Sequence, residues 1–124
     1  MPPIASAQAR AYLEGRGIQS PELMRHFKIG FADGTVFSMV SNGQKGKLKS
    51  LGILTDAGRE LFAGSLTFPI TDEAGQSVGL YGRSIDDSAK LKHRYLPGRH
   101  QGVFNRRASK AFSEIILTEG IIDA

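Results

Sequence analysis

The chain has 124 residues, of which 40% are hydrophobic and 23% charged, a composition typical of one small folded domain rather than a disordered segment. It contains no cysteine, which excludes a disulfide framework, a thiolate zinc site and a cysteine nucleophile within these residues. The formal net charge is +4, no apolar run approaches the roughly 20 residues of a membrane span, and the N-terminus lacks a secretion-signal pattern, so we expect a cytoplasmic protein.

Two helices are predicted near the N-terminus. Ser6 is a suitable N-cap for a helix that ends at Gly15. Ser20 followed by Pro21 indicates the start of a second helix, because proline is favoured at the first helical position. That helix is expected to stop by Gly30.

The next segment is predicted to form strands joined by a turn. Residues 35–40 have the composition of a strand, and Asn42-Gly43 is a hairpin-turn signal. Three lysines alternate after this turn, so a strand would place all of them on one face: Lys45, Lys47 and Lys49.

A hairpin is predicted from residues 65–70 and 77–85, with Pro69 placing its first strand at an edge or near its end. Residues 86–107 are expected to be a polar, basic loop. Residues 114–120 contain the apolar run Ile115-Ile116-Leu117 and are predicted to form a strand, since such a run is typical of a parallel strand covered on both faces. The expected fold class is α+β, with N-terminal helices, a small and mostly antiparallel sheet, and a final parallel strand that begins another unit.

Positive charge is concentrated between Ser88 and Lys110. This stretch holds seven basic side chains and no acidic one, and Tyr95 and Phe104 interrupt it. Cations next to aromatic rings suit a groove that binds the nucleic-acid backbone and stacks on bases, although a solvated surface loop is the alternative. Just before it, Arg83 follows a glycine, a pattern that allows close approach to a phosphate.

Short motifs follow one another along nearly the whole chain. They are AYLEGRGI at 11–18, FKIGFA at 27–32, GIL at 52–54, FPITD at 68–72, VGLYGR at 78–83, RYL at 94–96, FNR at 104–106 and EGIID at 119–123. In this order they resemble the N-terminal part of the catalytic core of bacterial DnaG-type DNA primases, ending just inside the TOPRIM domain of that family.

The resemblance implies two parts and a longer parent protein. Residues 1–112 would be the domain that precedes TOPRIM, and residues 113–124 would contain the first strand of a truncated TOPRIM domain. The family's zinc-binding domain would lie upstream, so zinc is expected only if such a domain exists outside this chain.

The resemblance also implies the chemistry of RNA primer synthesis, which is metal-assisted nucleotidyl transfer with Mg²⁺ or Mn²⁺. Glu119 matches the first TOPRIM acid, as a metal ligand or general acid/base, and Asp123 would lie close to it. The family's later Asp-x-Asp pair is absent from the sequence, so the metal site at Glu119 would be incomplete. We expect this chain alone neither to synthesise primers nor to bind a metal ion tightly.

The expected partners are a single-stranded DNA template, ribonucleotides and, through regions outside this chain, a replicative helicase, with no membrane. The predicted nucleic-acid- and nucleotide-binding residues are Arg83, Lys92, Arg94, Tyr95 and Arg106.

Four residues, at three places in the chain, depart from the family pattern. Pro97-Gly98 stands where many members have Asn-Ser, Ser65 where an Arg is frequent, and His26 where an Arg usually precedes the Phe. The departures are typical of a divergent primase of phage, plasmid or mobile-element origin. They also fit the alternative of an accessory module that binds single-stranded nucleic acid and has a degenerate TOPRIM domain. A TOPRIM nuclease or topoisomerase-like protein and a structural or protein-interaction role are the remaining alternatives.

Overall fold

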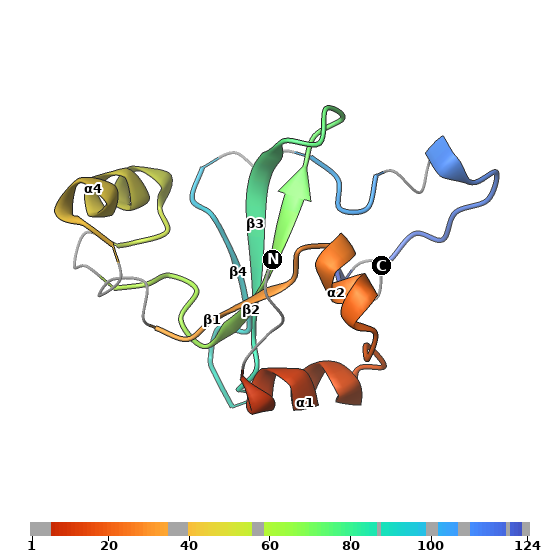
Figure 1. The fold of residues 1–124 in the computed structure, drawn as a ribbon, viewed down its shortest axis with the longest axis horizontal. Coiled ribbons are helices and arrows are strands. Elements are labelled where there is room, and N and C mark those ends of the chain that lie inside the picture. The colour runs from red at the N-terminus through yellow and green to blue at the C-terminus, as the bar shows by residue number, and fades with distance from the viewer. Residues whose placement is uncertain are drawn as a thin grey trace.

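The structure is a computed structural model that describes residues 6–34, 40–55, 59–86, 88–98, 102–106, 110–118 and 120–122. Within these ranges it contains three helices and one four-stranded antiparallel sheet (Figure 1), which confirms the α+β class. None of the described helices is long and apolar enough to cross a membrane. The strand expected over 35–40 lies outside the described residues except for its last position.

Both N-terminal helices form where the capping residues predict. Helix α1 spans Ala7–Gly15, and the Ser6 hydroxyl accepts a hydrogen bond from the Ala9 backbone N–H at 3.2 Å. Helix α2 spans Pro21–His26, and the Ser20 hydroxyl accepts one from the Leu23 N–H at 3.3 Å. Each cap satisfies a backbone donor that the first helical turn leaves unpaired.

The sheet has the order β1-β2-β3-β4, with all neighbours antiparallel. Its strands are β1 (Gly30–Ala32), β2 (Ser65–Thr71), β3 (Ser77–Ser84) and β4 (His93–Tyr95). The central pair, β2 and β3, is the hairpin predicted from the sequence. Strand β4 lies inside the stretch that was expected to be a loop, so that expectation was wrong for these three residues.

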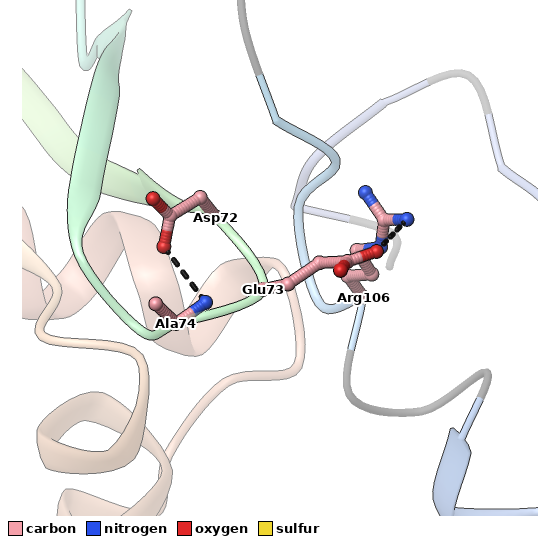
Figure 2. Close-up of polar contacts among 4 residues, drawn as sticks. All are labelled: Asp72, Glu73, Ala74 and Arg106. Carbon is pink, nitrogen blue, oxygen red and sulfur yellow. Dashed lines mark hydrogen bonds and ion pairs between the residues drawn. The ribbon is translucent and has the colours of Figure 1, made fainter.

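The turn between β2 and β3 is held by Asp72. Its carboxylate oxygen Oδ1 accepts hydrogen bonds from the backbone N–H groups of Ala74 and Gln76, both at 2.9 Å, and Figure 2 shows the first of these. Pro69 lies two residues past Thr67, the last β2 residue paired with β1. Strand β2 has no β1 partner at that point, so the missing proline N–H interrupts no β1–β2 hydrogen bond.

One face of the sheet packs against α1. Ala9 and Leu13 of α1 share a buried cluster with Leu66, Phe68 and Tyr81 of the central hairpin. These strand residues alternate with their neighbours, as expected for side chains on a single face. The same face carries Arg83, because Arg83 is paired across the strands with Leu66.

The opposite face of the hairpin is covered by Phe62. Gly82 is buried there, and a Cβ built on it would lie 3.0 Å from Phe62 Cε1 and closer still to Cδ1. Ser65, one of the family departures, is only 2% exposed on this face. An arginine would not fit at Ser65 without moving these neighbours, so the local packing accommodates the smaller residue.

The turn predicted at Asn42-Gly43 is wrong, because these residues begin helix α4 (Asn42–Leu51). The Ser41 hydroxyl accepts from the Gln44 N–H at 3.3 Å, and the Gln44 side-chain oxygen accepts from the Ser41 N–H at 2.9 Å. This reciprocal pair is a capping box. The helix ends at Gly52, whose φ of 84° is in the left-handed region that favours glycine.

The helix also changes the placement of the three lysines. Successive helical residues are rotated by about 100°, so Lys45 and Lys49 share one side of α4 and Lys47 lies on the other. They do not form the single charged strand face expected from the alternation. In Figure 1, α4 and α2 lie on opposite sides of the sheet.

The parallel strand expected at 114–120 is not present among the described residues. Residues 114–118 have no strand assignment, and Ile116 and Leu117 are 90% and 88% exposed. A parallel strand requires a neighbouring strand and a crossover connection, and the described part of this chain supplies neither for this segment. The segment instead runs outside the sheet and returns towards α2 (Figure 1).

Candidate nucleic-acid interface

Strand β4 places Lys92, Arg94 and Tyr95 at the rim of the sheet, and we call these three residues the β4 surface. Strand β4 pairs only with β3 and is last in the strand order. The Ser84 N–H donates to the Lys92 carbonyl at 2.9 Å, which fixes the backbone next to β4. Lys92 is exposed, Arg94 is partly buried and Tyr95 is 40% exposed. Lys92 and Arg94 are two residues apart and therefore share one face of this rim, whereas Tyr95 points to the other face, towards Tyr81.

Arg83 does not lie on the same face of the sheet as Arg94. Arg94 is paired with Gly82 and Arg83 with His93, and consecutive residues of a strand point to opposite faces. Arg83 is only 9% exposed, and its guanidinium carbon lies 5.9 Å from the centroid of the Tyr12 ring. This cation–π contact holds Arg83 between the sheet and α1.

A hydrogen bond links β3 to β4 beside the β4 surface. The Tyr81 hydroxyl lies 2.5 Å from His93 Nδ1, and the two rings are stacked with centroids 5.8 Å apart. The Tyr95 ring lies 5.1 Å from that of Tyr81. Burial raises the pKa of Tyr81, and the neighbouring Tyr95 raises it further, while Arg83 acts in the opposite direction. No sequence pattern indicated this contact, since it depends on the register of a three-residue strand.

Arg106 lies in a different segment, residues 102–106, which is anchored to the central hairpin at three points. A Cβ on Gly102 would lie 2.9 Å from Ile70 Cγ2, so the backbone passes close to the end of β2. The Phe104 ring contacts Phe27 and Phe68, with centroid distances of 5.2 and 6.2 Å. Arg106 forms an ion pair with Glu73 of the β2–β3 turn (Figure 2). The structure thus places Arg106 at the hairpin tip.

A cavity of about 470 Å³ lies between this segment, the end of α2 and the β2–β3 turn. Its lining includes Arg106 but none of the four other predicted binding residues. The lining residues come from separate parts of the chain, so no local sequence pattern indicated the cavity. The five predicted residues accordingly fall into three places: the β4 surface, the buried side of β3 and the cavity.

The predicted catalytic acids, Glu119 and Asp123, lie outside the described residues. Among the residues that the structure does describe, no three His, Cys, Asp or Glu side chains are grouped so that they could hold a metal ion. The catalytic roles of Glu119 and Asp123, and the role of Glu119 as a metal ligand, therefore stay predictions.

A comparison with known protein families shows to which family this chain is related. The family model described as "DNA primase catalytic core, N-terminal domain" matches residues 3–111. The chain belongs to this family. The DNA primase of Deinococcus radiodurans is 34% identical over 133 residues, a match that covers 90% of this chain and 23% of that protein. The chain thus spans less than a quarter of the length of this curated primase.

Solved primase structures share the fold. A DNA primase domain from Pseudomonas aeruginosa has a TM-score of 0.63 and 31% identity, covering 76% of this chain and 32% of that one. A DnaG primase catalytic domain bound to single-stranded DNA has a TM-score of 0.61 and 30% identity, covering 73% and 30%. The resemblance found in the sequence motifs is therefore confirmed for the DnaG N-terminal catalytic-core domain.

Proposed function

We propose that this chain is the template- and nucleotide-binding N-terminal region of a DNA primase that synthesises RNA primers for DNA replication. The observation that carries the proposal is the β4 surface, where two cations share one face of the sheet edge and a partly exposed tyrosine ring lies on the other face of the same edge. Described residues 88–98 contain no acidic side chain that would oppose phosphate binding. The DnaG relative bound to single-stranded DNA supports the choice of ligand.

Each residue of the β4 surface has a distinct role in this proposal. Lys92 and Arg94 neutralise backbone phosphates, and Arg94 has the planar donor geometry that suits a phosphate. Tyr95 stacks on a base without selecting its sequence. Arg83 is assigned a supporting role, because its guanidinium is held over Tyr12 and its removal would leave a buried space.

Primer synthesis itself is assigned to the longer parent protein. Glu119 and Asp123 would supply two of the carboxylates that a hard cation such as Mg²⁺ or Mn²⁺ prefers. The bound ion would stabilise the charge that develops on the phosphate oxygens during nucleotidyl transfer. The other ligands would come from the remainder of the parent. We expect this chain with template, ribonucleotides and Mg²⁺ or Mn²⁺ to make no primers, and robust product would refute that part of the proposal.

The binding role is tested by titrating a fluorescently labelled dT oligonucleotide and following its anisotropy at several salt concentrations. The double variant Lys92→Ala/Arg94→Ala should bind about tenfold more weakly, which corresponds to roughly 0.7 kcal/mol for each exposed charge contact. The slope of log affinity against log salt should become shallower by about 1.4, since each single-strand phosphate contact contributes about 0.7.

A matched control removes two lysines from α4. Lys45→Ala/Lys47→Ala lowers the net charge by the same amount at positions five or more residues before Gly52, where α4 approaches Pro97 beyond β4, and it should leave the affinity within about twofold of the original. Equal losses in both double variants would mean that binding depends on total charge, and the β4 surface would then have no special role. Replacing Arg83 would not serve this test, because it would perturb the packing on Tyr12.

A further inference from the structure

The cavity at the hairpin tip has the size and the lining of a ligand site. Its volume of about 470 Å³ falls within the range of small-molecule pockets. It lies between the end of α2, the β2–β3 turn and the segment that carries Phe104 and Arg106. None of the residues of the β4 surface lines it, so a ligand here would make contacts separate from those proposed above.

Aromatic rings form one side of this cavity. Phe27 and Phe104 both line it, with ring centroids 5.2 Å apart and planes inclined by 31°. Each ring is only partly buried, so part of its surface is open to a ligand. Such a surface favours a flat aromatic ring, because stacking on a nucleobase stabilises binding without requiring a particular base.

The charged lining favours an anion. Lys28, Arg106 and Lys110 line the cavity together with two acids, Asp72 and Glu73. Both acids already have partners: Asp72 accepts the turn N–H groups, and Glu73 pairs with Arg106. Since the Arg106 and Glu73 charges offset each other, an incoming anion would meet Lys28 and Lys110 against one carboxylate, Asp72, that is already hydrogen-bonded to the turn.

An incoming anion can replace Glu73 as the ion-pair partner of Arg106 at a small cost in free energy. Its two side chains are 43% and 60% exposed, and exposed pairs of this kind typically contribute about 0–1 kcal/mol. A phosphate is a better bidentate partner for arginine than a solvated glutamate. Figure 2 shows Glu73 reaching Arg106 from the turn, which is the position that a competing anion would take.

We propose that this cavity binds one nucleotide unit, with its base against Phe27 and Phe104 and its phosphate on Lys28, Lys110 and Arg106, in competition with Glu73. The cavity chemistry alone selects a flat aromatic anion, and the inference rests on the proposed function only for the choice of a nucleotide. The unit can be a free nucleotide or one residue of a single strand, and the arms of the experiment distinguish these sources.

The first arm titrates the 124-residue chain with adenosine 5′-monophosphate and, in parallel, with ribose 5-phosphate, using NMR or calorimetry. The base should make adenosine 5′-monophosphate bind at least about tenfold more tightly than the sugar phosphate. Glu73→Gln should tighten nucleotide binding by about two- to fivefold, because it releases Arg106. Lys28→Gln/Lys110→Gln should weaken it by about tenfold, and Glu14→Gln, which removes an acid outside the lining, should change nothing.

The second arm repeats the Glu73→Gln and lysine variants with the dT oligonucleotide. Variant effects on the oligonucleotide together with no nucleotide binding would assign the site to a residue of the strand. Variant effects confined to the nucleotide would assign it to free nucleotide. Absence of a Glu73→Gln effect on both ligands would overturn the inference.

Equal binding of the sugar phosphate and the nucleotide would also overturn it, because the aromatic wall would then have no function. These outcomes test the cavity separately from the proposed binding role of the β4 surface. If oligonucleotide binding still depends on Lys92 and Arg94 while the cavity variants have no effect, the inference fails and the proposed function stands. If no ligand binds in either arm, both fail.

Discussion

Replacing Gly52 by alanine should destabilise the protein through two separable effects. Gly52 ends α4 with a φ of 84°, and an alanine in this left-handed conformation costs about 1 kcal/mol. Its Cβ would also lie 2.7 Å from Pro97 Cγ and closer still to Cδ. Such overpacking typically costs about 1–3 kcal/mol, so we expect Gly52→Ala to lower the free energy of unfolding by about 2–4 kcal/mol.

A double-mutant cycle with Pro97→Ala separates the steric effect from the backbone effect. Without the proline ring, Gly52→Ala should cost only the conformational term of about 1 kcal/mol, leaving a coupling energy of about 1–3 kcal/mol. The effect of losing a proline on the unfolded chain cancels in the cycle, because it occurs both in the original chain and in the Gly52→Ala background.

The free energies can be measured by urea unfolding followed by circular dichroism. If Gly52→Ala costs the same in both backgrounds, the contact between α4 and Pro97 contributes nothing and the steric reasoning is refuted. Because Pro97 lies two residues past β4, the same variants should be titrated with the dT oligonucleotide. Weaker binding by Gly52→Ala alone, restored in the double variant, would show that this contact also positions the β4 surface.

Three further outcomes follow from the described contacts. The pKa of Tyr81 is raised in the folded state, so as the pH rises the unfolded chain loses the Tyr81 hydroxyl proton before the folded chain does. The free energy of unfolding should therefore fall as pH rises above about 10. Tyr81→Phe should make this fall with pH less steep in urea titrations at pH 9–11. Ser41→Ala should cost about 1 kcal/mol through loss of the α4 cap, measured by thermal unfolding, whereas Ser41→Asp should retain most of the stability. Gly82→Ala should cost about 1–3 kcal/mol against the Phe62 ring, and an unchanged urea midpoint would show that Phe62 moves aside freely.

The parts of the fold that the sequence predicts correctly depend on local signals. Ser6 and Ser20 cap the first two helices, and the alternating residues on both sides of Asp72 form the central hairpin. Helix α4 was not predicted, because the hairpin-turn signal Asn42-Gly43 was given more weight than the helix-start signal at Ser41 and Gln44. Serine followed three residues later by glutamine is a capping-box pattern. Strands β1 and β4 have three residues each, and their pairing depends on the neighbouring strand more than on their own propensity.

The candidate site was predictable in composition but not in arrangement. The strand period could have placed Arg83 on the same face as Tyr81, and hence under the helices, but the pairing of Arg94 with Gly82 requires the register of β4. The partner of Arg106 is 33 residues away in the sequence, so no local pattern reveals it. The parallel strand expected at 114–120 was predicted from composition alone, whereas the burial of such a strand depends on strands and helices that must come from elsewhere.

That exposed run has a practical consequence for the isolated chain in solution. Ile115, Ile116 and Leu117 form a short β-branched and aliphatic stretch whose backbone is not paired with any described strand. Unpaired segments of this kind pair readily with copies of themselves. We therefore expect the 124-residue protein to associate as its concentration rises, and a chain ending at residue 112 to stay monomeric under the same conditions. Sedimentation of the two at matched concentrations would measure how strongly this segment governs the colloidal behaviour of the domain.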